Sequence, residues 1–214
     1  MQDLIVGAYG DDDAGGASGA VYVLFLQATG CSTDAPTMTP APSTPAPTPR
    51  PSTGTPTGTP VPTTDGCGSD GTVSSAQKIS NHYGSMPYPL GGSDYFGWST
   101  TSVGDVDGDG VTDLAVGAEL DDDGGSNWGA VYILFMATDG TVKTSQKISG
   151  WGNSHFGDFY TLGSSDYFGG SCAGLGDLNE DGVSDVLVGA ERDDDVYSDS
   201  GAVYVLFLKT DGDV

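Results

Sequence analysis

DVDGDGVTDLAVGA, at residues 105–118, sets a cluster of acidic side chains directly in front of an apolar segment. Four aspartates fall within nine positions of this stretch: Asp105, Asp107, Asp109 and Asp113. Like charges at this density repel one another unless a cation lies among them. The near copy DLNEDGVSDVLVGA at residues 177–190 shows that the arrangement recurs. We therefore interpret the stretch as a cation-binding loop followed by a strand.

The composition narrows the kinds of partner. The chain has 214 residues and a formal net charge of −24, and it is long enough for one or two domains with an ordinary core. This acidic balance argues against nucleic acid and anionic membrane surfaces, and it suits cation binding or solubility. No apolar run approaches the ~18 residues of a membrane span, so we expect no direct insertion into a membrane.

An internal repeat organises the chain. Three blocks align without gaps and begin at Asp3, Asp113 and Asp185. SDYFG precedes the last two blocks, and QKIS follows the first two at Gln77 and Gln146. One unit therefore consists of Phe-Gly, an acidic loop, a Gly-Ala strand, an Asp triplet, a Gly-Ala-Val-Tyr strand and QKIS. A repeat of this kind predicts a row of similar units that contact their neighbours.

The apolar pattern predicts four strands in each unit. Residues 130–136 are apolar on both faces, which indicates a strand covered on both sides. Residues 141–149 scatter Lys143, Ser145 and Lys147 along their length, as a solvated edge strand would. The other two strands lie after Phe-Gly and at GVTDLAVGA. A repeated four-stranded antiparallel meander predicts an all-β fold of β-propeller blades, here a partial propeller of about two and a half blades.

The repeat also predicts how the chain is divided. We expect a partial blade, an insertion rich in Pro, Thr and Ser, the end of the first blade with a connecting loop, a complete blade with a cation loop, and a partial blade with a cation loop. Their ranges are, in that order, 1–30, 31–70, 71–94, 95–166 and 167–214. Because only Asp3 of the first acidic loop is present, we expect the chain to be a segment of a longer propeller whose remaining blades are missing.

The insertion holds ten of the chain's twelve prolines, a composition that favours extended chain over a packed core. We interpret it as an O-glycosylated loop or stalk within a repeat, with a domain boundary as the alternative. Cys31 and Cys67 flank it, and a disulfide across its neck would fit an oxidising compartment. Cys172 is left over and is expected to be a buried thiol in a strand.

The succession FG, DxDxDGxxDL, VGA and GAVYV resembles the FG-GAP repeat of integrin α-subunit β-propellers. The likeness covers nearly all of the chain outside the insertion. One departure is consistent, because the proline of GAP is replaced by Tyr9, Glu119 and Glu191. The resemblance implies an extracellular or cell-surface protein with a role in ligand binding or cell adhesion.

The acidic loops present oxygen ligands at positions 1, 3, 5, 7 and 9, a spacing that suits a hard cation. The predicted ligands of the first loop are Asp105, Asp107, Asp109, the carbonyl of Val111, and Asp113. Those of the second are Asp177, Asn179, Asp181, the carbonyl of Val183, and Asp185. Gly110 and Gly182 would make the sharp turn. An EF-hand is excluded because its position 12 acid is replaced by Val116 and Val188.

Calcium is favoured over magnesium as the cofactor, because an irregular turn of carboxylates and carbonyls does not form the tight octahedron that magnesium demands. An Asp- and Gly-rich turn that holds no ion is the alternative.

Each repeat carries one Asp triplet, at the end of the blade opposite the calcium loops. The triplets lie at residues 11–13, 121–123 and 193–195. Family resemblance implies that a protein or glycan ligand binds this face, and the alternative is that the triplets are simply solvated turns. His82 and His155 recur with the repeat, so we interpret them as structural. We also interpret Trp98, Trp128 and Trp151 as packing residues.

The sequence thus favours a calcium-binding, extracellular FG-GAP segment that serves ligand binding or adhesion and is not an enzyme. One alternative is an accessory propeller of a larger secreted enzyme, such as a phospholipase D-like hydrolase. Another is a structural glycoprotein of a cell surface or wall.

Overall fold

The computed structural model describes residues 3–12, 16–28, 69–150, 162–195 and 197–214. Within these ranges the chain forms ten β-strands: β1 (Leu4–Ala8), β2 (Ala20–Ala28), β3 (Ser69–Ile79), β4 (Ser99–Gly104), β5 (Asp113–Ala118), β6 (Ala130–Met136), β7 (Val142–Ser149), β8 (Phe168–Gly176), β9 (Asp185–Ala190) and β10 (Ala202–Leu206). No helix in this part of the chain is long and apolar enough to cross a bilayer.

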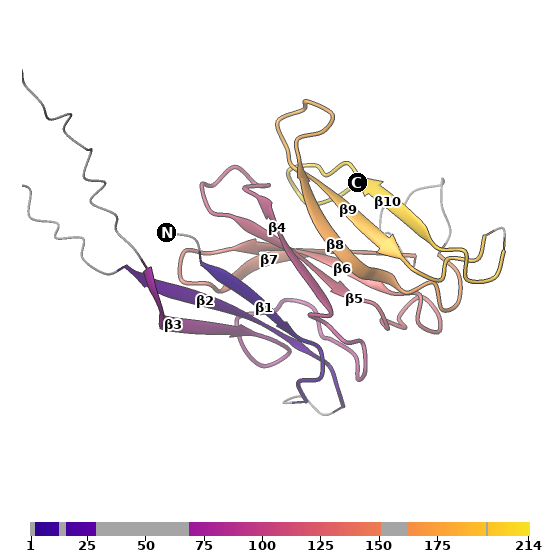
Figure 1. The fold of residues 1–214 in the computed structure, drawn as a ribbon, viewed down its shortest axis with the longest axis horizontal. Coiled ribbons are helices and arrows are strands. Elements are labelled where there is room, and N and C mark those ends of the chain that lie inside the picture. Colours follow the sequence, from indigo (N-terminus) through magenta and orange to yellow (C-terminus); the bar gives the residue numbers. More distant parts are fainter. Residues whose placement is uncertain (1–2, 13–15, 29–68, 151–161, 196) are drawn as a thin grey trace, which may run out of the picture.

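The strands form three antiparallel sheets that lie side by side, and we number them as blades 1 to 3 (Figure 1). Blade 1 has the strand order β1-β2-β3, blade 2 has β4-β5-β6-β7, and blade 3 has β10-β9-β8. Blade 2 is the predicted four-stranded meander, and the described parts of its neighbours each contain three of the four strands. The all-β architecture of partial propeller blades is therefore confirmed.

Strand β6 is covered on both faces, as an inner strand of a blade must be. Every one of its residues is buried, as its two apolar faces predict. Strand β7 lies at the edge of the sheet as expected, but the prediction that Ser145 is solvated is wrong. It is only 7% exposed, because it pairs with Leu134, whose side chain belongs to the apolar layer against blade 1.

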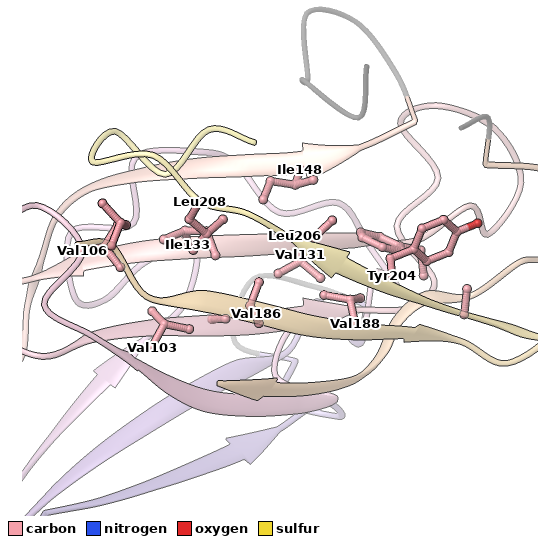
Figure 2. Close-up of a cluster of buried hydrophobic side chains, with 14 of the residues drawn as sticks. Val103, Val106, Val131, Ile133, Ile148, Val186, Val188, Tyr204, Leu206 and Leu208 are labelled. Carbon is pink, nitrogen blue, oxygen red and sulfur yellow. The ribbon is translucent and has the colours of Figure 1, made fainter. Parts of the chain in front are cut away.

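Two apolar layers join the three blades. The layer between blades 1 and 2 includes Val21, Val23 and Leu134. The layer between blades 2 and 3 includes Val131 and Ile133 from β6. Blade 3 contributes the face that is equivalent to the Leu134 face of blade 2, with Val186, Val188, Tyr204 and Leu206 (Figure 2). Each layer brings the same face of one blade against the opposite face of the next, so the blades follow one another in a constant orientation.

The Phe-Gly pairs lock each blade to the one before it. Phe96 and Phe168 are fully buried, and their backbones form parallel bridges to Gly19 and Gly129 of the preceding blade. The approach is so close that a methyl group on Gly117 would lie 2.0 Å from the carbonyl oxygen of Gly169. Only glycine leaves room for this contact, which explains the Gly-Ala part of the repeat.

Several predicted features lie outside the described residues: the insertion up to residue 68, the Cys31–Cys67 pair, Trp151 and His155. Among the described ones, His82 is exposed, and Trp128 packs partly against the layer between blades 2 and 3. Cys172 is a free thiol in β8 and is half-buried rather than fully buried. Burial raises the pKa of this thiol to about 11, so it is a poor nucleophile at neutral pH.

Candidate metal centre

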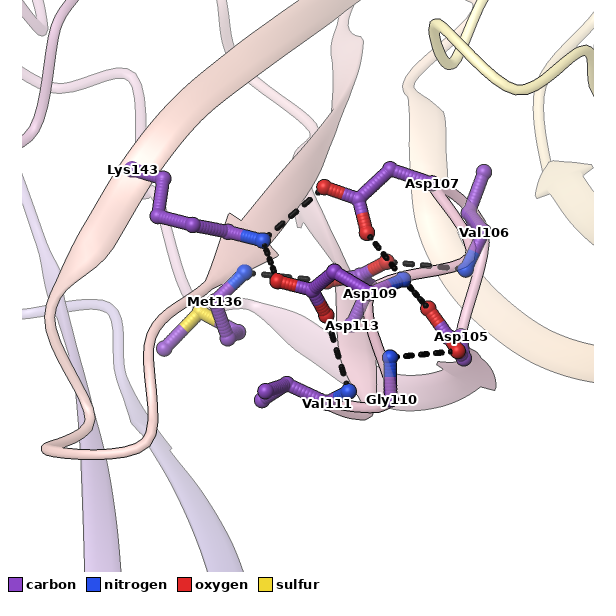
Figure 3. A network of polar contacts seen from close by, with 9 residues as sticks. All are labelled: Asp105, Val106, Asp107, Asp109, Gly110, Val111, Asp113, Met136 and Lys143. Atoms are coloured by element: carbon purple, nitrogen blue, oxygen red, sulfur yellow. Dashed lines mark hydrogen bonds and ion pairs between the residues drawn. The ribbon is translucent and has the colours of Figure 1, made fainter.

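The first acidic loop connects β4 to β5 and brings three exposed carboxylates together. One oxygen each from Asp105, Asp107 and Asp109 lies within 4.8 Å of the others. Backbone N–H groups fix the turn, since Asp109 and Gly110 donate to the two oxygens of Asp105 at 2.9 and 2.7 Å (Figure 3). Gly110 has a φ of 90°, a left-handed conformation that favours glycine. The predicted sharp turn is present.

The second acidic loop, between β8 and β9, has the same backbone geometry. Asp181 and Gly182 donate to the two oxygens of Asp177 at 3.0 and 2.8 Å. The amide group of Asn179 takes the place of a carboxylate, and its Nδ2 donates to Asp181 at 2.9 Å. The second loop therefore gathers two carboxylates and one neutral oxygen donor where the first gathers three carboxylates.

The last aspartate of each loop is buried and ties the loop to the end of a strand. Asp113 accepts hydrogen bonds from the N–H groups of Val106 and Met136, both at 2.9 Å. Asp185 does the same with Leu178 at 2.8 Å and Leu208 at 3.1 Å. Burial raises the pKa of Asp113 despite these two hydrogen bonds. These aspartates therefore anchor the loops, whatever else they bind.

The two valines predicted to offer carbonyl ligands lie in the same turns. The N–H of Val111 donates to Asp109 Oδ1 at 2.8 Å, and that of Val183 donates to Asp181 Oδ1 at 2.9 Å. These bonds hold the backbone of position 7 beside the carboxylate of position 5. Coordination by the two carbonyls stays a prediction.

Sequence reasoning missed a lysine at the first loop. Lys143 of β7 reaches the loop and contacts Asp107 Oδ2 at 2.9 Å and Asp109 Oδ2 more closely (Figure 3). The hydrogen bond from Lys143 holds the pKa of Asp109 below its usual range. No repeat signal pointed to this residue, since Ser74 occupies the equivalent place in blade 1.

The donor chemistry of both loops fits a hard divalent cation. Carboxylate and amide oxygens are the ligands that such ions prefer, and the acidic groups at positions 1, 3 and 5 are exposed. The ammonium group of Lys143 contacts both Asp107 and Asp109, so a single cation can reach oxygens of two loop positions at once. A lysine neutralises one charge, whereas the loop carries three at these positions.

The Asp triplets at the opposite end are neither simple solvated turns nor wholly available to a ligand, because Asp121 and Asp193 are buried and Asp11 is partly buried. Asp121 is 1% exposed. Its Oδ2 accepts a hydrogen bond from Tyr132 at 3.0 Å and forms an ion pair with Lys147 at 2.6 Å. Lys147 was expected on a solvated edge and is instead held in this network. The later members, Asp122 and Asp123, are exposed.

The same network recurs in the other blades. In blade 1, Tyr22 and Lys78 both bind Asp11, at 3.1 and 2.7 Å. In blade 3, Tyr204 donates to Asp193 at 2.5 Å. The tyrosine lies eleven residues after the aspartate each time. This constant offset, together with the lysine of QKIS, was the signal in the sequence that could have revealed the network.

An aromatic cluster lies at the same end as the triplets. Tyr9, which replaces the proline of GAP, packs edge-on against Trp98 with ring centroids 4.5 Å apart. Tyr95 stacks on Trp98 at 6.1 Å. Tyr9 and Trp98 remain 46% and 40% exposed. Trp98 is thus more than a packing residue, since its cluster offers an aromatic surface to solvent.

The chain is similar in sequence to known proteins. The FG-GAP repeat matches residues 96–134 and 168–206. Integrin alpha-11 of Homo sapiens is 38% identical over 117 residues, which cover 52% of this chain and 8% of that protein. Integrin alpha-M of Mus musculus is 37% identical over 111 residues, covering 51% and 8%. Integrin alpha-PS5 of Drosophila melanogaster is 34% identical over 113 residues, covering 52% and 10%.

The chain therefore spans a tenth or less of the length of these relatives. The matched segments coincide with blades 2 and 3, from the buried phenylalanines to the third strand of each blade. With its Phe-Gly locks, acidic loops and repeated blades, the chain contains two FG-GAP repeats and is similar over about half of its length to the integrin α subunits.

Proposed function

We propose that this chain is a calcium-binding, extracellular FG-GAP segment that serves ligand binding or cell adhesion. The observation that carries the proposal is the convergence of Asp105, Asp107 and Asp109 in one exposed turn, repeated with the same hydrogen bonds in the loop of Asp177 and Asp181. The likeness to integrins supports the adhesive role and the cell-surface location.

Calcium would bind each loop through the predicted oxygen ligands. The first loop offers Asp105, Asp107, Asp109, the Val111 carbonyl and Asp113; the second offers Asp177, Asn179, Asp181, the Val183 carbonyl and Asp185. Both oxygens of Asp113 already accept a backbone hydrogen bond, but a carboxylate oxygen has a second lone pair for a cation. Calcium accepts such an irregular shell of 6–8 oxygens, whereas magnesium requires an octahedron.

At the first loop, calcium has to displace Lys143. The ammonium group lies on Asp107 and Asp109, two of the proposed ligands. A divalent ion neutralises the loop more completely than a single positive charge, so we expect the lysine to move toward solvent when calcium binds.

The ligand surface that we propose is the end of the blades opposite the calcium loops. It combines the exposed rings of Tyr9 and Trp98 with the outer members of the Asp triplets, such as Asp122 and Asp123. Exposed aromatic faces suit a protein or glycan ligand, since they offer apolar contact with little loss of side-chain entropy. Binding at this surface requires no catalytic group, so we propose a binding role rather than an enzymatic one.

An array of extracellular-matrix proteins and glycans tests this function. The fluorescently labelled chain is applied in EDTA and in about 1 mM calcium, the upper end of the dissociation constants of extracellular calcium modules. We expect binding to a small set of spots that Trp98→Ala weakens at least tenfold, because the substitution removes an exposed ring from the proposed surface.

The control is Val73→Ala, which truncates an apolar side chain that is 44% exposed on β3, toward the end of blade 1 that carries Asp3 and away from the proposed ligand surface. Binding that is equal for the wild type and Trp98→Ala would contradict the proposed surface. A complete absence of binding in calcium would favour the structural or accessory role instead.

A further inference from the structure

The aromatic cluster at the boundary between blades 1 and 2 is held in place by the fold. Its rings, those of Tyr9, Tyr95 and Trp98, have centroids 4.5 to 6.1 Å apart. Tyr95 has a φ of 59°, a left-handed conformation that a residue other than glycine adopts only at a cost in energy. The surrounding structure therefore imposes the position of this ring, and the cluster presents a preformed surface to solvent.

The equivalent boundary between blades 2 and 3 shows what such a tyrosine accepts. Tyr167 is the equivalent of Tyr95 and has the same φ of 59°. The guanidinium carbon of Arg192 lies 4.9 Å from the centroid of the Tyr167 ring, a distance typical of a cation–π contact. A tyrosine in this conformation thus presents a face that an arginine covers.

The aromatic cluster lacks this cation. Leu120 takes the place of Arg192 in blade 2, since each donates its backbone N–H to the carbonyl of the aspartate just before the tyrosine, at 3.3 and 3.4 Å. Among the described residues, the cations that lie over aromatic rings are found at other rings. A guanidinium group for the cluster therefore has to come from outside the described residues.

The inventory of charges shows which cation of the chain remains. The chain has six Lys and Arg residues. Five belong to the described structure, and each contacts a carboxylate or a tyrosine ring there: Lys78, Lys143, Lys147, Arg192 and Lys209. The sixth is Arg50, which lies at the middle of the insertion within the sequence PAPTPRP of residues 45–51.

The neighbours of Arg50 also suit an aromatic surface. The four prolines of residues 45–51 alternate with other residues, a sequence that favours polyproline II. Tyrosine and tryptophan rings dock proline-rich segments, because this extended helix loses little entropy on binding. The exposed Asp12 lies three residues after Tyr9, and it forms no ion pair with another described residue. The edge of the cluster is thus complementary in charge to an arginine.

The insertion is long enough to reach the cluster from its points of attachment. It connects Ala28 of β2 to Ser69 of β3, at the end of blade 1 opposite Tyr9. Strand β2 has nine residues and therefore spans about 30 Å. Arg50 lies 22 residues after Ala28 and 19 before Ser69. Since 19 residues of polyproline II cover about 59 Å, both arms of the insertion span the length of the blade.

We propose that residues 45–51 dock on the aromatic cluster of their own chain, with the Arg50 guanidinium and the neighbouring prolines against its exposed rings. The inference rests on the ligand surface of the proposed function, but it requires neither calcium nor an external ligand. A docked segment competes with an external ligand for the same rings, so the insertion regulates access to that surface.

Nuclear magnetic resonance of the full nitrogen-15-labelled chain in EDTA tests the contact. The indole N–H resonance of Trp98 is identified by its loss in Trp98→Phe. A tether of this length gives an effective concentration of about 1 mM. With a dissociation constant of about 0.1–1 mM for the segment, the cluster is then occupied in about half to nine-tenths of the molecules.

Two triple variants compare prolines within the same insertion. The docking variant carries Pro47→Ser, Pro49→Ser and Pro51→Ser, and the control variant carries Pro56→Ser, Pro60→Ser and Pro62→Ser. We expect the docking variant to shift the Trp98 resonance and the control variant to leave it at the wild-type position. Equal positions in the wild type and the docking variant would overturn the proposal.

A peptide with the sequence of residues 43–53 supplies the segment in trans. Added to the docking variant, it should return the Trp98 resonance toward the wild-type position with a dissociation constant of about 0.1–1 mM. A peptide with Arg50→Glu should bind at least fivefold more weakly, because it loses the cation–π contact and places a negative charge near Asp12. Equal binding of the two peptides would remove Arg50 from the contact and overturn the proposal.

Dilution and the array separate the remaining outcomes. A Trp98 shift that disappears when the wild-type chain is diluted would make a second copy the source of the segment, and would also overturn the proposal. If docking and the proposed function both hold, the docking variant should bind the array ligand about two- to tenfold more tightly, since the competing segment is removed. A chain that docks its insertion but binds no array spot would retain this inference and contradict the proposed function.

Discussion

The two ends of each blade are both acidic, but they neutralise their charge in different ways. At the end with the Asp triplets, Asp121 is buried and is paired with Lys147 and Tyr132 of its own blade. At the other end, Asp105, Asp107 and Asp109 are exposed, and Lys143 is the one cationic side chain among the described residues that pairs with them. The triplet end of blades 1 and 2 carries its cation within the repeat, whereas we propose that the loop end accepts one from solution.

This difference explains why the acidic composition alone does not show which Asp-rich turns bind a cation. A buried carboxylate needs a fixed partner, because an unpaired charge in a low-dielectric interior is costly. An exposed cluster tolerates exchange between water, lysine and a metal ion. The burial of the carboxylate therefore decides whether an Asp-rich turn is a structural element or a candidate binding site.

The largest effect is expected from removing the internal cation. Lys147→Met leaves the buried Asp121 with Tyr132 as a partner but without a positive charge, so we expect the free energy of unfolding to fall by about 3 kcal/mol. Urea denaturation measures it. The control, Lys209→Met, removes a lysine that is 61% exposed in its ion pair with Asp213 and should cost under about 0.5 kcal/mol. Equal effects of the two variants would contradict the claim that the buried Asp121 needs Lys147 as a fixed partner.

The next effect is expected from the external cation. With a dissociation constant of about 10⁻⁴–10⁻³ M, 1 mM calcium stabilises each loop by about 0.4–1.4 kcal/mol. Thermal melts in calcium should therefore show a higher midpoint than melts in EDTA, and the double variant Asp105→Asn with Asp177→Asn should lose the difference. A wild type that melts at one temperature in both buffers would contradict the proposed role of the loops.

An effect of similar size to that of calcium is expected from pH at the triplet end. Burial, with Glu191 nearby and partly offset by Arg192, raises the pKa of Glu119 to about 7 from its ordinary 4.5. The folded chain then holds a proton that the unfolded chain releases between these values, so stability should fall by about 1–2 kcal/mol as pH rises from 4.5 to 7.

Glu119→Gln is neutral throughout this range. Denaturation at both pH values should therefore show a smaller decline for this variant than for the wild type. An unchanged decline would assign the effect to other groups, such as Asp94, whose burial raises its pKa to about 6.

The smallest effect separates the two acidic loops. Lys143 competes for Asp107 and Asp109 in the first loop, and the described residues of blade 3 offer no equivalent competitor at the second. Lys143→Met should therefore tighten calcium binding by the first loop about two- to fivefold, the scale of an exposed ion pair, and leave the second unchanged. Calcium titrations in the Asp177→Asn background isolate the first loop. Weaker binding by the Lys143→Met variant would show that the lysine supports the site.

Much of the fold was predictable because the same apolar pattern and the same glycine positions occur in three copies of the repeat. The apolar faces of residues 130–136 predicted a strand covered on both sides, and the structure buries every residue of it. Gly110 predicted the sharp turn correctly because backbone conformation at this position depends on local sterics.

The features that escaped prediction depend on contacts between strands. Lys143 reaches the first loop from β7, and Ser145 is buried by a layer that belongs to another blade. Asp121 looked like a solvated turn because its partners lie 11 and 26 residues further along the chain. Sequence separation hides such pairs unless the spacing is compared between the repeats.

Counting bound ions by isothermal titration calorimetry is the most direct test of the claim that each acidic loop binds one divalent cation. Calcium titrated into the metal-free chain should bind with a stoichiometry of two ions per chain, and Asp105→Asn or Asp177→Asn alone should each reduce it to one. No saturable heat in the wild type, or a stoichiometry of two retained in both variants, would contradict the account.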